Sequence, residues 1–100
     1  MNISIPTLLR IKPNAIYKLG KYLRKESFIR VAVFYGTGLK EMLKEQITIS
    51  FDSSEIQTVH EDTINSNAVE DIFKTAFSLP GKVDAIVAIG GGKVIDYCKY

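Results

Sequence analysis

The chain has 100 residues and a mass of 11.2 kDa, which is enough for one small domain. Its 46% hydrophobic and 24% charged residues are typical of a globular protein and exclude intrinsic disorder and collagen-like repeats. No apolar run approaches the roughly 18 residues that span a bilayer, and no signal-peptide pattern opens the chain. The formal charge of +2 is too balanced to indicate nucleic acid or an anionic membrane as partner.

The cysteine and histidine content argues for a reducing compartment and against a local metal cluster. Cys98 is the only cysteine, so no internal disulfide can form and a cytoplasmic location is expected. Packing is enough to explain Cys98, and the lone His60 is expected to be a surface or half-buried residue. The densest basic stretch has helical spacing, which favours a solvated helix face over a phosphate-binding patch: Lys18, Lys21, Arg24 and Lys25.

The first part of the chain predicts a strand, a helix and a second strand. Residues 3–12 read as extended, and Pro6 would restrict them to a sheet edge. Asn14 follows a proline and is a candidate helix cap. The predicted helix ends at Ser27, and its apolar face comprises Ile16, Leu19, Tyr22 and Leu23. The apolar run 30–35 predicts a strand buried on both faces, as in a parallel sheet.

A glycine-containing turn, Gly36-Thr37-Gly38, separates this strand from the next helix. Helical spacing resumes with Leu39, Met42, Leu43 and Ile47. Residues 47–60 are ambiguous, because the alternation of Ile47, Ile49 and Phe51 fits either a strand or a continued helix. Residues 55–60 are predicted to form the next parallel strand.

The last part of the chain predicts one more helix and the clearest strand. Residues 67–70 have the form of a capping box headed by Asn67. The helix that follows ends at Pro80-Gly81, and its apolar face comprises Val69, Ile72, Phe73, Ala76 and Phe77. Residues 83–89 are a buried strand that runs into three glycines. The alternation of strand and helix predicts an α/β fold with a parallel, Rossmann-like sheet.

The glycine triplet Gly90-Gly91-Gly92 is the strongest indication of a ligand site. Glycine lets the backbone approach a ligand closely, and the N–H groups of a helix beginning there would face an anion. Ligands of open α/β sheets bind at the carboxyl ends of strands, where this turn lies. We therefore favour phosphate binding over the alternative of a tight turn without a ligand.

Two common phosphate-binding motifs are excluded by single positions. The fingerprint G-x-G-x-x-G would need glycine at Ile95, or at Glu41 if counted from Gly36. The P-loop would need glycine at Val87 and a hydroxyl residue at Val94. A nucleoside triphosphatase of the P-loop type is therefore not indicated.

Residues 85–99 resemble the motif G-G-G-[SKT]-x-x-D-x-[AC]-K of the iron-containing alcohol dehydrogenase and glycerol dehydrogenase superfamily. The form G-G-G-K-V-I-D is most similar to the glycerol dehydrogenase and glycerol-1-phosphate dehydrogenase branches, and dehydroquinate synthase is a more distant relative. The order of predicted elements extends the resemblance to the whole chain, although the specific motif covers about a dozen residues.

The resemblance implies a two-domain, homo-oligomeric enzyme that oxidises glycerol, glycerol phosphate or a similar small polyol. Its N-terminal α/β domain would bind NAD or NADP, and a helical C-terminal domain would hold a divalent metal, zinc or iron. Residues 1–100 would be the N-terminal part of the cofactor domain, ending inside a helix at Tyr100. We then expect further strands beside 83–89, which would otherwise be an open edge, and no turnover from the 100 residues alone.

The family motif implies a role for each residue of the glycine turn. The segment expected to wrap the cofactor pyrophosphate is Gly90, Gly91, Gly92, Lys93 and Val94. Lys93 either contacts the phosphates or is solvated at the helix start. Asp96 matches the motif aspartate; because a carboxylate beside pyrophosphate is unfavourable, it should bond loop N–H groups or face the substrate.

One departure from the family concerns the cofactor. Many members carry an aspartate at the end of the strand that here covers 31–35, where it holds the adenine-ribose hydroxyls and repels a 2′-phosphate. Gly36 occupies that position here. We hypothesise that NADP is tolerated, with Lys40 as one contact.

Two other functions remain open from the sequence. One is a lyase similar to dehydroquinate synthase, which uses NAD transiently. The other is a non-enzymatic, flavodoxin-like module that binds a phosphate-bearing ligand or a protein partner.

Overall fold

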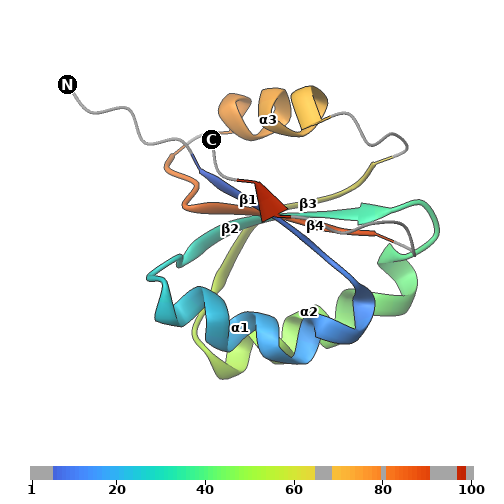
Figure 1. The fold of residues 1–100 in the computed structure, drawn as a ribbon, viewed down its shortest axis with the longest axis vertical. Helices are drawn as coiled ribbons and strands as arrows, with labels where there is room; N and C mark the ends of the chain where they lie inside the picture. Colours follow the sequence, from blue (N-terminus) through green and yellow to red (C-terminus); the bar gives the residue numbers. More distant parts are fainter. Residues whose placement is uncertain (1–5, 65–68, 80, 91–96, 99–100) are drawn as a thin grey trace.

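A sheet of four parallel strands in the order β3-β2-β4-β1 forms the centre of the fold (Figure 1). The computed structural model describes residues 6–64, 69–79, 81–90 and 97–98. The strands are β1 (Thr7–Ile11), β2 (Arg30–Gly36), β3 (Gln57–Ile64) and β4 (Ala85–Ile89), with the antiparallel β5 (Tyr97–Cys98) outside β1. The predicted α/β fold with a parallel, Rossmann-like sheet is confirmed.

Helices cover both faces of this sheet (Figure 1). A 3-10 turn, η1 (Pro13–Ala15), leads into α1 (Ile16–Lys25), which lies with α2 (Lys40–Ser53) on one face; α3 (Val69–Ser78) covers the other. The connections from β1 to β2 and from β2 to β3 run in one direction across the sheet, and that from β3 to β4 returns. Crossovers of one handedness then place the returning helix on the opposite face.

The core is divided by the sheet into two apolar layers, because each central strand is buried on both sides. Val31, Val33 and Tyr35 of β2 face α1 and α2, whereas Ala32 and Phe34 face α3. All five side chains are at most 3% exposed. This agrees with the strand buried on both faces that the apolar run predicts.

The contact between α1 and α2 depends on Gly20. Its N–H donates to Ser50 Oγ at 2.9 Å, and a Cβ at this position would overlap the carbonyl oxygen of Ser50. The buried face of α1 is therefore Ile16, Leu19, Gly20 and Leu23. The prediction that Tyr22 belongs to this face is wrong: its side chain is 41% exposed, because the helix turns the small Gly20 toward α2 instead.

Two other predictions near the helix ends need correction, and one ambiguity is resolved. Asn14 does not cap α1, because it lies inside η1 and the N-cap residue is Ala15, which makes no side-chain capping bond. The ambiguous residues after Ile47 continue α2 as far as Ser53. β3 then begins at Gln57 and runs to Ile64, beyond the predicted end at His60.

The apolar faces predicted for α2 and α3 are only partly buried. Met42 is 69% exposed and Phe77 is 59% exposed, whereas Leu43, Ile47 and Ile72 are buried. The predicted cap at Asn67 and the helix stop at Pro80 lie outside the described residues, and α3 ends at Ser78.

The sequence predicts that residues 83–89 would be an open edge of the sheet without further strands. This prediction is wrong, because β1 pairs with β4 along its whole length and β2 pairs with it on the other side. Pro6 precedes β1 and does not restrict it to an edge: Leu8 and Leu9 also pair with β5. Residues 97–98 thus form a strand where the sequence predicts a helix. Their backbone takes up hydrogen-bonding groups of β1 that a helix would leave unpaired.

Within the described residues, none of the helices has the length and apolar character needed to cross a membrane.

Candidate functional site at the carboxyl edge of the sheet

The carboxyl ends of the four parallel strands meet at one edge of the sheet, and the ends of β1 and β4 are joined there by a hydrogen bond. The N–H of Gly90 donates to the carbonyl of Ile11 at 3.1 Å. Since ligands of open α/β sheets bind outside the carboxyl ends of their strands, this bond holds the first glycine of the triplet where a ligand would lie.

Gly36, at the end of β2, lies against the end of β4. A Cβ at Gly36 would be 3.2 Å from the carbonyl oxygen of Ile89, 3.3 Å from Leu39 Cδ1 and 3.9 Å from Gly90 Cα. Such contacts are tighter than most side chains tolerate, so the position favours glycine for close approach. Gly36 and Gly90, which are 54 residues apart in sequence, are therefore neighbours at the edge.

The turn after Gly36 leads directly into α2. The N–H of Leu39 donates to the carbonyl of Gly36 at 3.0 Å, and Gly38 has a φ of +80°, which favours glycine. Lys40 is the first residue of α2 and is half-buried. The N-terminus of α2 thus adds backbone N–H groups and a positive dipole end near the glycine turns.

Tyr35 joins β2 to β3 just below this edge. Its side chain is fully buried, and its hydroxyl donates to Glu61 Oε2 at 2.9 Å. Burial, and then the hydrogen bond and negative charge of Glu61, raise the pKa of the Tyr35 phenol well above its ordinary value. Tyr35 therefore acts as a neutral donor that fixes the spacing of the two strands.

Neither the role of Glu61 nor the end of β3 is predicted from the sequence, because residues 61–63 are polar and hide the strand pattern. Asp62 is exposed, and its Oδ1 accepts the N–H of Thr63 at 2.8 Å. Residues 60–63 are all polar, so no alternation of apolar and polar residues signals that the strand continues.

His60 is half-buried, in agreement with its predicted setting. Its ring packs against Phe34 with centroids 5.6 Å apart, and its Nε2 lies 3.8 Å from Asp62 Oδ2. Within residues 6–64, 69–79, 81–90 and 97–98, no three His, Cys, Asp or Glu side chains gather in an arrangement that could hold a metal ion. The described part of the chain therefore does not supply a metal site.

Of the predicted site residues, the structure brings Gly36 and Gly90 together. Cys98 contributes backbone pairing in β5. The remaining members of the predicted pyrophosphate segment lie outside the described residues: Gly91, Gly92, Lys93, Val94 and Asp96.

A parallel sheet covered by helices on both faces, with glycine turns at the carboxyl edge, defines a Rossmann-like α/β domain. A search of curated proteins found no match. The model of the iron-containing alcohol dehydrogenase family matches residues 10–100. The chain belongs to this family of metal-dependent, alcohol-dehydrogenase-like oxidoreductases, which generally use NAD(P) and a metal.

Proposed function

We propose that the chain supplies part of the cofactor site of a metal-dependent, NAD(P)-linked dehydrogenase. Its substrate would be glycerol, glycerol phosphate or a similar small polyol or alcohol. The observation that carries the proposal is the close approach of Gly36 and Gly90 at the carboxyl edge, in a chain that belongs to a family of oxidoreductases. A cytoplasmic, homo-oligomeric enzyme is part of the same proposal.

The absence of a side chain at Gly36 lets the ends of β2 and β4 approach closely, which brings the first glycine of the triplet to the edge where a dinucleotide would bind. The pyrophosphate would lie on the backbone of Gly90, Gly91 and Gly92, with Lys93 and Val94 completing the segment. When bound, NAD(P) would supply the hydride acceptor and the metal would supply a Lewis acid for the substrate hydroxyl. This chain's own role is to bind and orient the cofactor.

The charges of the segment support a division of roles. The ammonium of Lys93 would attract the pyrophosphate, while the carboxylate of Asp96 would be repelled by it. We therefore assign Asp96 to loop N–H groups or to the substrate side of the cofactor.

The metal and the substrate contacts belong, in this proposal, to a helical domain beyond residue 100. Residues 1–100 would be the N-terminal part of the dinucleotide domain.

The cofactor preference would follow from Gly36. No carboxylate stands there to repel a 2′-phosphate, and the tight contact with Ile89 opposes any side chain at the position. We propose that NADP is tolerated, with the Lys40 ammonium as one contact to its extra phosphate. Titration of the full-length enzyme with both cofactors tests this: binding of NAD tenfold or more tighter than NADP would contradict it.

The activity itself is tested by oxidation of glycerol and glycerol phosphate by the metal-loaded full-length enzyme with each cofactor. The expected result is stoichiometric formation of reduced cofactor, and none from the 100-residue chain alone. Turnover of a phosphorylated substrate with release of phosphate and no net reduction would instead indicate a lyase similar to dehydroquinate synthase. Replacing Gly91 by Val should abolish cofactor binding, measured by calorimetry, in the same enzyme.

A further inference from the structure

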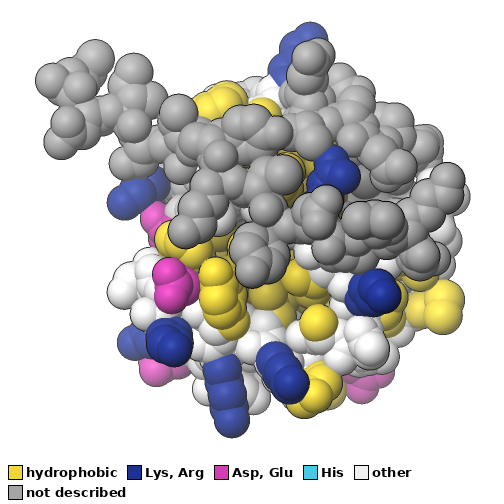
Figure 2. Space-filling model, in the orientation of Figure 1, with side chains coloured by type: hydrophobic (Ala, Val, Ile, Leu, Met, Phe, Trp, Pro, Cys, Tyr) yellow, Lys and Arg dark blue, Asp and Glu magenta, His cyan; other side chains and the backbone are white. Residues whose placement is uncertain are grey.

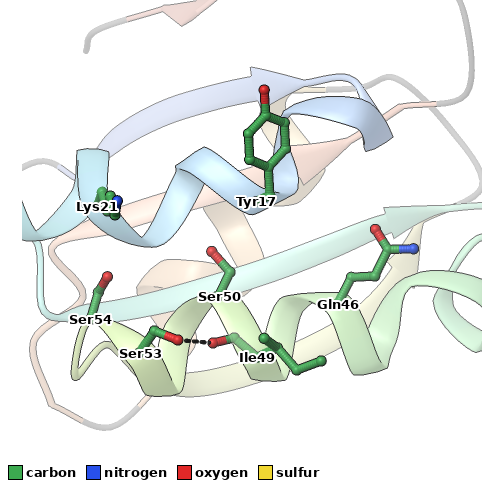
Figure 3. Close-up of a pocket in the computed structure, with 7 residues that line it drawn as sticks. All are labelled: Tyr17, Lys21, Gln46, Ile49, Ser50, Ser53 and Ser54. Carbon is green, nitrogen blue, oxygen red and sulfur yellow. Dashed lines mark hydrogen bonds between the residues drawn. The ribbon is translucent and has the colours of Figure 1, made fainter.

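The helices α1 and α2 leave a groove between them on the solvent side of the helix layer (Figure 3). Its volume is about 290 Å³, and it is lined by Tyr17 and Lys21 of α1 and by Gln46, Ile49, Ser50, Ser53 and Ser54. None of these residues belongs to the glycine turns or to the carboxyl edge of the sheet. The groove is therefore a second concave surface that the proposed function does not use.

The floor of the groove is held rigidly. Ser50 is 7% exposed and its Oγ accepts the N–H of Gly20 at 2.9 Å, where the two helices approach most closely. Ser53 Oγ donates to the carbonyl of Ile49 at 2.8 Å, as Figure 3 shows. Because these bonds lie within and between the helices, the groove is formed before any partner arrives.

The walls present large apolar side chains to solvent. Tyr17 is 71% exposed and Ile49 is 60% exposed, although both are of types that favour burial. Met42, which is 69% exposed, lies seven residues before Ile49 and so on the same side of α2. Met42 and Ile49 are therefore exposed apolar residues about two helical turns apart on α2, and Gln46 lies between them.

The α1 wall of the groove carries charge of one sign. Within Ile16–Lys25 there are four basic residues and no acidic one: Lys18, Lys21, Arg24 and Lys25. All four are exposed, as predicted for a solvated face. Figure 2 shows Lys and Arg side chains along the lower part of the molecule, where α1 and α2 lie in Figure 1.

We propose that this groove binds an amphipathic helix of a partner protein that carries acidic residues along one flank. The apolar face of that helix would cover Tyr17 and Ile49, and its carboxylates would face the basic row of α1. Exposed apolar side chains on both walls of a groove between two helices fit helix-in-groove recognition, and opposite charge along one wall fixes orientation and speeds association.

Two other occupants fit less well. If a second copy of the chain bound here, the same face of each copy would meet the other. Since α1 and α2 together carry six basic and three acidic residues, like charges would then face each other. A free phosphate would meet Lys21 as the only charged residue of the lining and would lie near the C-terminal, negative end of α2.

The test uses two synthetic amphipathic peptides of about four helical turns with the same leucine strip. One carries glutamates along one flank and the other carries lysines in their place. Fluorescence anisotropy with the purified full chain should show the glutamate peptide binding at least about tenfold more tightly. No binding, or equal binding of both peptides, overturns the proposal.

Variants with matched controls locate the site. Ile49→Ser and Lys21→Glu should each weaken binding of the glutamate peptide about tenfold, and Lys21→Glu should narrow the difference between the peptides. The controls lie on α3, across the sheet: Phe77→Ser, whose parent side chain is 59% exposed, and Lys74→Glu should bind like the wild type. Equal weakening by the controls, or self-association on sedimentation that Ile49→Ser removes, would overturn the assignment to a partner helix.

Discussion

Asp84 and Arg30 bond to each other in both directions across β4 and β2. The N–H of Arg30 donates to Asp84 Oδ2 at 2.9 Å, and the N–H of Asp84 donates to the carbonyl of Arg30 at 2.7 Å. The same carboxylate oxygen accepts the N–H of Ile29 at 2.9 Å, and Lys82 Nζ lies 3.5 Å from the other oxygen. One carboxylate thus fastens the amino ends of the two central strands, at the end of the sheet opposite the glycine turns.

Replacing Asp84 by Ala should destabilise the fold by about 2 kcal/mol, because two backbone N–H groups lose a charged acceptor in a part-buried place. Urea denaturation of wild type and variant measures the difference. The matched control is Asp52→Ala, since Asp52 is an exposed residue of α2. An equal, small loss in both variants would show that the carboxylate at Asp84 is not structural.

The same carboxylate predicts sensitivity to acid. Burial alone would raise the pKa of Asp84, but the N–H groups of Arg30 and Ile29 and the charge of Lys82 outweigh it and hold this pKa below its ordinary value. The unfolded chain then binds more protons at acid pH, so this stabilisation is complete above about pH 4 and is lost as pH falls through the folded pKa. The difference in unfolding free energy between wild type and Asp84→Asn should shrink as pH falls toward 3.

The raised pKa of Tyr35 predicts that the fold loses stability at alkaline pH. Its folded pKa is raised by burial and by Glu61, so the folded state keeps the phenolic proton longer than the unfolded state. The stabilisation is present below the ordinary tyrosine pKa of about 10 and is lost as pH rises above it. Tyr35→Phe should cost about 1 kcal/mol at pH 7 and flatten the fall in stability above pH 10. Thermal unfolding between pH 7 and 11 would show it, and an identical alkaline fall in both proteins would contradict it.

The fold class could be predicted from local pattern, but the strand order could not. The apolar runs at 30–35 and 83–89 are buried on both faces, as their composition indicates. The position of β1 beside β4 depends on pairing between residues about 78 apart, such as Leu8 with Ile86, which no periodicity encodes. The prediction that residues 83–89 need further strands beside them was wrong because it could not take account of this pairing with β1.

In the candidate site, too, the residues could be predicted from the sequence but their arrangement in space could not. Glycine in the turns marks where backbone must be bare, so Gly36 and Gly90 could both be identified as candidates from the sequence. Their contact through Ile89 is a consequence of strand order and needed the structure. Glu61 was missed because its partner, Tyr35, lies on the neighbouring strand and the bond is invisible to any local pattern.

Gly36→Ala should weaken NAD(P) binding in the full-length enzyme by about tenfold, because the new methyl group must push Ile89 and Leu39 by a few tenths of an ångström. The expected change in unfolding free energy is smaller, about 1 kcal/mol. Gly38→Ala is the control: nothing lies within 4 Å of its Cβ, so its cost comes from the φ of +80° alone. Calorimetric titration of cofactor should separate the two, and unchanged affinity in Gly36→Ala would remove this turn from the site.

Gly20→Ala should destabilise the protein although alanine is the better helix former. In an isolated helix the change would stabilise by about 1 kcal/mol. Here the added Cβ would overlap the carbonyl oxygen of Ser50, which is backbone of α2 and has little room to move. We expect a net loss of about 2 kcal/mol or more, with α1 and α2 forced apart. Equilibrium unfolding in urea measures the loss, and Ser50→Ala, which removes only the hydroxyl that accepts the N–H of Gly20, should cost less. A Gly20→Ala protein as stable as the wild type would mean that the helices do not pack this closely.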